Sequence, residues 1–345
     1  MQSRSYNRSL QMLALAVVCF TFPLIFMGGL VTSHQAGMSV PDWPNSYGYN
    51  MFSFPPRLWV GGIFFEHTHR LMGSFVGLLC IALTICAWMT KNPRWVKWVA
   101  TSVLIAVTIQ GILGGLRVDL VNLPLAIVHG CFAQAVFCLA AFMAAISSKW
   151  WIQAPKRHGT NTSRRLITLA FVCVGVIYMQ LIIGACMRHL KAGLAIPDFP
   201  TNYGHILPTG NLQAINDYRV TKLNLDPVTW GQIWLHFAHR MGALVVTILL
   251  LSLIAHVIYH NRRDGKLLRP AILLLFLLAT QITLGILTVL WRKPADIATA
   301  HVAGGALILM VTFLLAVRAR HLYSLSPVQT SADEIPAEDL KALPV

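Results

Sequence analysis

The chain has 345 residues, of which 56% are hydrophobic and only 11% are charged, and its formal net charge is +15. Soluble domains carry about 25% charged residues, so this composition excludes an ordinary water-soluble globular fold. The basic residues stand in short clusters between apolar runs, which is the pattern of membrane topology and excludes a nucleic-acid-binding face.

All seven cysteines lie inside apolar runs and form no C-x-x-C pair, so we expect buried thiols without a disulfide framework.

Eight apolar runs are each long enough to cross a bilayer, which requires about 20 helical residues. In chain order, they lie near residues 10–32, 67–90, 96–117, 123–147, 166–188, 231–258, 269–291 and 296–319. The first run is too long for a signal-peptide core, and no A-x-A cleavage site follows it, so we expect it to remain as a helix. The sequence therefore predicts an all-α integral membrane protein with eight transmembrane helices.

The distribution of lysine and arginine among the loops predicts the orientation of these helices. One side of the membrane receives sixteen of these residues and the other side receives eight. The richer side is cytoplasmic by the positive-inside rule, so we expect a multi-pass protein of the cell (inner) membrane with both termini in the cytoplasm. The long loops 33–66 and 189–230 then lie outside. Residues 326–345 hold four acidic side chains and few apolar ones, which predicts a disordered cytoplasmic tail.

An internal repeat divides the chain into halves. The segment AGMSVPDWPNSYG at 36–48 matches AGLAIPDFPTNYG at 192–204, at a constant offset of 156 residues. The repeat continues with His69-Arg70 matching His239-Arg240 and with His129 matching His301. We therefore expect two repeated four-helix bundles, over residues 1–150 and 151–325, related by an axis along the membrane normal.

Four of the thirteen histidines occur at repeat-related positions near the start of even-numbered predicted helices: His69, His129, His239 and His301. These helices all run from the outside to the inside, so the four imidazoles are predicted at one depth, close to the outer surface. An ionisable side chain in a membrane helix is costly and indicates a functional site unless a neighbouring helix satisfies it. Recurrence at four positions favours the functional interpretation.

The spacing of these histidines favours one pair of ligands in each half. His69 and His129 are separated by 60 residues, and His239 and His301 by 62, so the second and fourth helices of each bundle can face one another. Two neutral imidazoles suit the two axial positions of haem iron, whereas zinc takes three or four protein ligands. The sequence therefore predicts one iron held by His69 and His129 and a second held by His239 and His301.

Charged residues beside the histidines add further expectations. Glu66 lies three residues before His69 on the same helix face, where the second half has His236. A carboxylate there can transfer protons or stabilise positive charge at a reacting centre. Alternatively, it can cap the start of its helix. The sequence leaves the catalytic and the capping roles open. Arg70 and Arg240 either pair with haem propionates or extend to the outer interface.

Taken together, these motifs resemble the haem A synthase family of cytochrome oxidase assembly, over essentially the whole chain from residue 10 to residue 320. The resemblance rests on PDWP at 41–44, PDFP at 197–200, Glu66-x-x-His69-Arg70, the HGCFAQ segment from His129, His236-x-x-His239-Arg240 and His301. It implies an oxidoreductase that converts haem O to haem A for the biogenesis of cytochrome c oxidase. In that reaction a ring methyl group is oxidised to a formyl group in two successive hydroxylations.

The resemblance also implies that the two halves have different functions. The C-terminal half would carry a haem b cofactor on His239 and His301, and the N-terminal half would take the substrate haem at His69 and His129, with Glu66 required for activity. Haem O synthase and an electron donor are the implied partners, and a homo-oligomer is compatible. Neither outer loop contains the cysteines that some members carry there. The alternatives are a bis-histidine di-haem membrane cytochrome b that carries electrons, and a haem transporter or chaperone.

Overall fold

The computed structural model describes residues 5–324. Within that range, eight helices are long and apolar enough to cross a membrane, which confirms the predicted all-α membrane fold. They are α1 (Arg8–Ser33), α2 (Gly62–Met89), α3 (Arg94–Asp119), α4 (Leu123–Ser147), α6 (Asn161–His189), α8 (Trp230–Asn261), α9 (Gly265–Leu290) and α10 (Ala295–Leu322). The expected tail at 326–345 lies outside the described residues.

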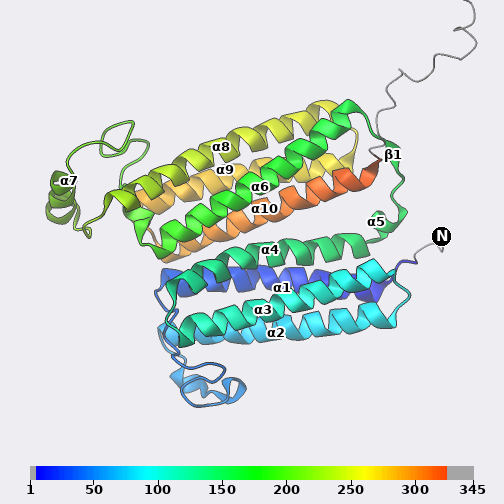
Figure 1. The fold of residues 1–345 in the computed structure, drawn as a ribbon, viewed down its shortest axis with the longest axis horizontal. Helices are drawn as coiled ribbons and strands as arrows, with labels where there is room; N and C mark the ends of the chain where they lie inside the picture. Colours follow the sequence, from blue (N-terminus) through cyan, green and yellow to red (C-terminus); the bar gives the residue numbers. More distant parts are fainter. Residues whose placement is uncertain (1–4, 325–345) are drawn as a thin grey trace, which may run out of the picture.

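The long helices form two groups that lie side by side (Figure 1). Helices α1 to α4 surround one apolar core, and α6, α8, α9 and α10 surround most of the other. The groups meet where α10 packs against α1 and α4 and where α6 packs against α4. This arrangement supports the expected pair of bundles, while the boundary at residue 150 and the separate roles of the halves stay predictions.

Shorter elements, which were not expected from the sequence, connect the long helices. The helix α5 (Lys149–Gln153) and the strand β1 (Arg157–His158) join the two groups, and β1 pairs in parallel with β2 (Tyr323–Ser324). The outer loops contain η1 (Met51–Ser53), η2 (Pro56–Leu58), η3 (Ala192–Leu194), α7 (Leu212–Tyr218) and the π-helical turn η4 (Arg219–Leu223). Helix α6 begins five residues before its predicted start, because its first turn is polar and is capped by Thr160.

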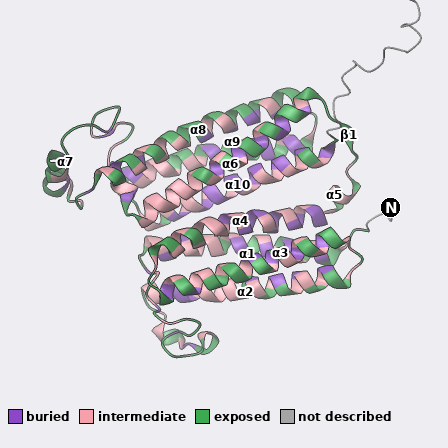
Figure 2. Ribbon diagram, viewed as in Figure 1, coloured by how far each residue is buried: buried purple, intermediate pink, exposed green. Residues whose placement is uncertain are grey.

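Fully buried apolar side chains fill mainly one end of each group (Figure 2). The first core takes its side chains from 10–17, 76–87, 96–103 and 140–146. The second takes most of its side chains from 166–177, 246–257, 267–278 and 308–322. These segments are the ends of the helices away from the two long loops. The opposite ends carry the four repeat-related histidines, and most side chains there stay partly accessible.

Close packing of α1 against α10 depends on Gly29. A Cβ atom at Gly29 would lie 2.6 Å from Cγ2 of Thr299, whose hydroxyl is 3.0 Å from that of Ser33. We expect Gly29→Val to push these helices apart and to lower the free energy of unfolding by about 1–3 kcal/mol, the usual cost of overpacking. Thermal unfolding of the detergent-solubilised protein measures this loss.

Gly175→Val is the matched control for this prediction. Gly175 also lies within a long helix, but a Cβ atom there would have no neighbour within 4 Å. Both variants introduce the same β-branched residue, so any difference between them reports packing and not helix propensity. Equal losses of stability in the two variants would contradict the assigned role of Gly29.

Candidate functional site

The structure brings the four repeat-related histidines together in two pairs. His69 of α2 faces His129 of α4, with ring centroids 6.5 Å apart and ring planes inclined by 80°. His239 of α8 faces His301 of α10, with ring centroids 6.4 Å apart and ring planes inclined by 70°. The two halves therefore present almost the same pair geometry, each between their second and fourth long helices.

Each of these imidazoles lies against a glycine of a neighbouring helix. A Cβ atom at that glycine would stand only 3.0–3.1 Å from the imidazole Cε1, which is tighter than an ordinary contact. The four contacts are Gly28 with His69, Gly114 with His129, Gly184 with His239 and Gly285 with His301. The missing side chains let the helices approach closely, so the imidazoles pack directly on the backbone.

Glutamines hold three of the four histidine segments. In each case the side-chain Nε2 donates a hydrogen bond to the backbone carbonyl oxygen of the histidine. The bonds run from Gln110 to His129 (2.7 Å), from Gln180 to His239 (2.7 Å) and from Gln281 to His301 (2.9 Å). Each glutamine lies four residues before the glycine that contacts the histidine ring, and α1 has Leu24 at this position. The role of the glutamines was not identified from the sequence. The Q-x-x-x-G spacing that recurs in three helices could have indicated it.

The third long helix of each group, α3 or α9, also orients one imidazole ring of each pair. Nδ1 of His129 lies 3.2 Å from the backbone oxygen of Gln110, and Nδ1 of His301 lies 3.2 Å from that of Gln281. A hydrogen bond from Nδ1 to a carbonyl selects the tautomer whose Nε2 carries a lone pair for a metal. The environment of these rings therefore suits ligation through Nε2.

The geometry of the pairs fits an iron porphyrin held between two rings. With metal–nitrogen bonds of about 2 Å on both sides, the centres of two axial imidazoles lie about 6 Å apart. The observed separations of 6.5 and 6.4 Å are close to this value. Within residues 5–324, no group of three or more His, Cys, Asp or Glu side chains could hold a metal ion. The donor set in that range therefore suits haem iron and not a zinc site.

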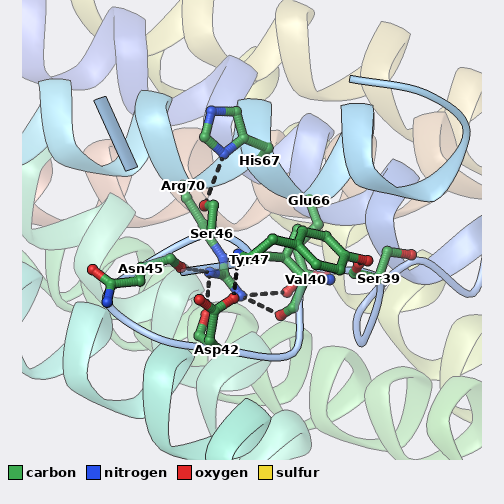
Figure 3. Close-up of polar contacts among 9 residues, drawn as sticks. All are labelled: Ser39, Val40, Asp42, Asn45, Ser46, Tyr47, Glu66, His67 and Arg70. Atoms are coloured by element: carbon green, nitrogen blue, oxygen red, sulfur yellow. Dashed lines mark hydrogen bonds and ion pairs between the residues drawn. The ribbon is translucent and has the colours of Figure 1, made fainter. Parts of the chain in front are cut away.

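Glu66 is buried beneath the first outer loop (Figure 3). Its Oε2 accepts a hydrogen bond of 2.9 Å from the backbone N–H of Val40, and its Oε1 lies 3.0 Å from Nη2 of Arg70. Helix α2 starts at Gly62 and has no side-chain cap, so the alternative in which Glu66 caps this helix is wrong. The carboxylate instead ties the loop to α2, one turn from His69.

Arg70 and Arg240 anchor the two outer loops in the same way. Nη1 of Arg70 donates to the carbonyl oxygens of Asp42 (2.6 Å) and Asn45 (2.9 Å), and its Nη2 donates to that of Val40 (2.7 Å). Arg240 donates to the carbonyl oxygens of Ile196 (3.1 Å), Asp198 (2.7 Å) and Thr201 (2.9 Å). Both guanidinium groups are therefore engaged by the loop backbone, and a contact with haem propionates stays a prediction.

His236 makes in the second half the contact that Glu66 makes in the first. The backbone N–H of Ile196 donates to Nδ1 of His236 at 3.2 Å, and Ile196 is the repeat partner of Val40. The halves thus share the geometry of this contact and differ in its charge. A carboxylate paired with an arginine occupies the position in the first half, and an imidazole occupies it in the second.

The repeated loop motif forms a tight turn in each outer loop. Asp42 accepts hydrogen bonds from the backbone N–H groups of Tyr47 (2.7 Å) and Gly48 (2.8 Å). Burial alone would raise the pKa of Asp42, but the hydrogen bonds from Gly48 and Tyr47 outweigh it and hold this pKa below its ordinary value. Asp198 makes the equivalent bonds in the second loop, to Tyr203 (2.8 Å) and Gly204 (3.1 Å).

His67 belongs to the support of the loop and not to the histidine pair. Its side chain is fully buried, and its Nδ1 lies 3.2 Å from the hydroxyl of Ser46 (Figure 3). Its ring also packs against those of Phe54 and Trp59. Residues two apart on a helix point to different sides, which explains why His67 faces the loop while His69 faces His129.

Comparison with known proteins places the chain beside a group of membrane enzymes. The sequence model of a family described as cytochrome oxidase assembly protein matches residues 60–313, a range that contains all four paired histidines. The chain is 26% identical over 322 residues to the heme A synthase of Shewanella oneidensis, covering 84% of this chain and 91% of that protein. It is 27% identical over 334 residues to the heme A synthase of Chelativorans sp., covering 85% and 86%. It is 26% identical over 306 residues to that of Geobacillus kaustophilus, covering 86% of each.

We expect Gly114→Ala to displace His129, because the new Cβ atom would stand 3.1 Å from its ring. Disturbing a residue that positions a metal ligand lowers the affinity for the metal by about 10–100-fold. Optical titration of the purified protein with haem measures the change as weaker binding and a reduced low-spin spectrum. Gly111→Ala in the same helix is the control, since a Cβ atom there meets nothing within 4 Å. Unchanged haem binding in Gly114→Ala would refute the assigned role of this glycine.

Proposed function

This chain belongs to the family of cytochrome oxidase assembly proteins, and we propose that it acts as a haem A synthase, a membrane oxidoreductase that converts haem O to haem A. The conversion oxidises a ring methyl group of haem O to a formyl group in two successive hydroxylations. The observation that carries the proposal is the presence of two separate imidazole pairs in one membrane fold. The enzyme needs such a combination, since it must hold a haem substrate and a haem cofactor at once. The names of the similar proteins support the same reaction.

We assign the C-terminal pair, His239 and His301, to a haem b cofactor, and the N-terminal pair to the iron of the substrate. The charge beside each pair supports this assignment. Glu66 holds a carboxylate near the N-terminal pair, where the second half has His236. A fixed negative charge favours a site in which positive charge develops and protons are released during oxidation.

The space beside the N-terminal pair supports the same assignment. Gly73 and Gly77 lie one and two turns along α2 from His69, and a Cβ atom at either would meet nothing within 4 Å. The repeat-related residues of α8 are Ala243 and Thr247. The first half therefore offers more room along this helix, as a haem with a bulky apolar substituent requires.

The residues of the chain bind and orient the substrate, while the bound iron porphyrins supply the redox chemistry. His69 and His129 hold the substrate at the open end of the first bundle. Glu66, held in place by Val40 and Arg70, lies one helical turn from His69 and provides a carboxylate that can exchange protons. The outer loop that Arg70 anchors lies at this end of the bundle and buries Glu66. Reducing equivalents come from an external electron donor, since the sequence contains no flavin or nicotinamide fingerprint.

We also propose the cellular setting from the distribution of charge and the chemistry of the substrate. The excess of basic residues in the loops opposite the two long ones supports a position in the cell membrane with both termini in the cytoplasm. The two imidazole pairs then lie toward the outer surface. Haem O synthase is the partner that supplies the substrate.

The reaction is tested by co-expressing the protein with a source of haem O and analysing the extracted haems by mass spectrometry. The synthase is expected to yield haem A, whose formyl group changes the mass and the optical spectrum of the extracted haem. A di-haem electron carrier or a haem transporter would return haem O unchanged. Recovery of haem O alone, with reducing equivalents present, would contradict the proposed function.

We expect Glu66→Gln to lower turnover by about 100-fold or more, the range typical of a lost acid–base group. The amide oxygen can still accept the hydrogen bond from Val40, so the loop and the haem content should be retained. Haem A formation and bound haem are measured on the same preparation. His236→Gln, at the repeat-related position, is the control and should retain turnover, because no negative charge is lost there. Equal activity of Glu66→Gln and the wild type would argue against a role for the charge.

We expect His239→Ala to remove the haem b cofactor from the C-terminal half, because one of its two axial ligands is lost. The pyridine haemochrome assay of the purified variant gives the type and amount of haem that remains. His256→Ala, at a histidine far along the same helix α8, is the control and should keep the wild-type haem content. A full complement of haem b in His239→Ala would mean that another residue is the ligand.

A further inference from the structure

Arg117 is a cation near the N-terminal histidine pair for which the described part of the chain provides no ion-pair partner. It lies in the last turn of α3, on the same helix face as Gln110 and Gly114, which contact His129. Its side chain is partly buried. Both ion pairs found within residues 5–324 belong to other residues, and no side-chain hydrogen bond of Arg117 occurs in that range. A partly buried cation gains from a counter-charge, so this position suits an anion.

The surroundings of Arg117 place this charge between the loop and the histidine pair. Its electrostatic interactions reach Glu66 of α2 and both His69 and His129. Its Nη1 lies 3.1 Å from the position that a Cβ atom of Gly37 would take, so the guanidinium extends beneath the first outer loop. Glu66 is already paired with another arginine at 3.0 Å. Glu66 therefore interacts with Arg117 through space but makes its direct ion pair with Arg70.

This charge is specific to the first half. The repeat that relates Gln110 to Gln281 and Gly114 to Gly285 relates Arg117 to Thr288. The hydroxyl of Thr288 donates to the carbonyl oxygen of Leu284 within its own helix. A second partly buried arginine, Arg188 of α6, donates to the carbonyl oxygen of Gly29 and to the hydroxyl of Ser33. Arg117 differs from both Thr288 and Arg188 in having no side-chain acceptor among residues 5–324.

We propose that Arg117 binds a carboxylate of the porphyrin held in the N-terminal site. The inference rests on the proposed function in requiring a porphyrin between His69 and His129. The propionate groups of haem lie along one edge of the ring, and a guanidinium binds a carboxylate through two parallel hydrogen bonds. Axial ligation alone leaves the ring free to turn about the line through the two imidazoles. A carboxylate held by Arg117 removes that freedom and decides which ring methyl group faces the reacting position.

The test compares iron protoporphyrin IX with its dimethyl ester, which lacks the carboxylate charges. Both are titrated into the full-length protein in nanodiscs, and binding at the N-terminal site is the spectral change that His69→Ala abolishes. The wild type should bind the diacid about 10–100-fold more tightly than the ester, as expected for a charge-assisted contact. Arg117→Gln should bind the two porphyrins with equal affinity. Arg117→Lys keeps the charge and should keep part of the preference.

Arg292→Gln is the control, because Arg292 is an exposed arginine just beyond the end of α9, the helix that is the repeat partner of α3. This variant should keep the wild-type preference for the diacid. Haem retained by the C-terminal pair reports correct folding in every variant, and the wild-type comparison of the two porphyrins needs no variant at all. Equal affinity of the wild type for diacid and ester, or an undiminished preference in Arg117→Gln, would overturn the inference and leave the proposed function intact. Failure of the wild type to bind any porphyrin at His69 would instead overturn the proposed function together with this inference.

Discussion

The contact between glycine and imidazole is the constraint on which both histidine pairs depend. At four places the missing side chain of a glycine lets a histidine ring pack directly on a neighbouring helix. The ring separations of 6.5 and 6.4 Å follow from how closely these helices approach. The dense apolar cores lie at the other ends of the bundles and hold the helices in register. Each bundle therefore has one end that is packed for stability and one end that is open for a ligand.

The histidine–arginine dipeptide joins this open end to the loop above it. Consecutive residues on a helix point about 100° apart, so the histidine can face the bundle while the arginine reaches outward. In both halves the guanidinium donates hydrogen bonds to three carbonyl oxygens of the loop. Beside an apolar surface these oxygens would otherwise lack hydrogen-bond donors. The ligand position and the path of the loop are thus coupled through a single turn of helix.

The halves share this scaffold and differ in the charged and polar side chains placed on it. Three repeat-related positions carry the difference: Glu66 with His236, Arg117 with Thr288, and Leu24 with Gln180. The first half holds a carboxylate and two arginines around its histidine pair, whereas the second half holds one arginine and neutral groups at the matching positions. The two imidazole pairs nevertheless keep almost the same geometry. Under the proposed function, these differences would adapt one copy of the duplicated frame to a resident cofactor and the other to a substrate.

The sequence by itself determined the class of the protein, its eight spanning helices, the internal repeat and the four histidines. These are local features, because an apolar run of about 20 residues and a constant offset between motifs can be read along one dimension. Only the tertiary structure decided that Glu66 accepts a hydrogen bond from Val40, that Arg70 binds loop carbonyls and that three glutamines support the histidines. Those contacts join residues on different helices and loops, so they depend on how the helices face one another and on the path of each loop. The same reason applies to Arg117, since the sequence does not reveal which residues surround a cation or whether a counter-charge lies within residues 5–324.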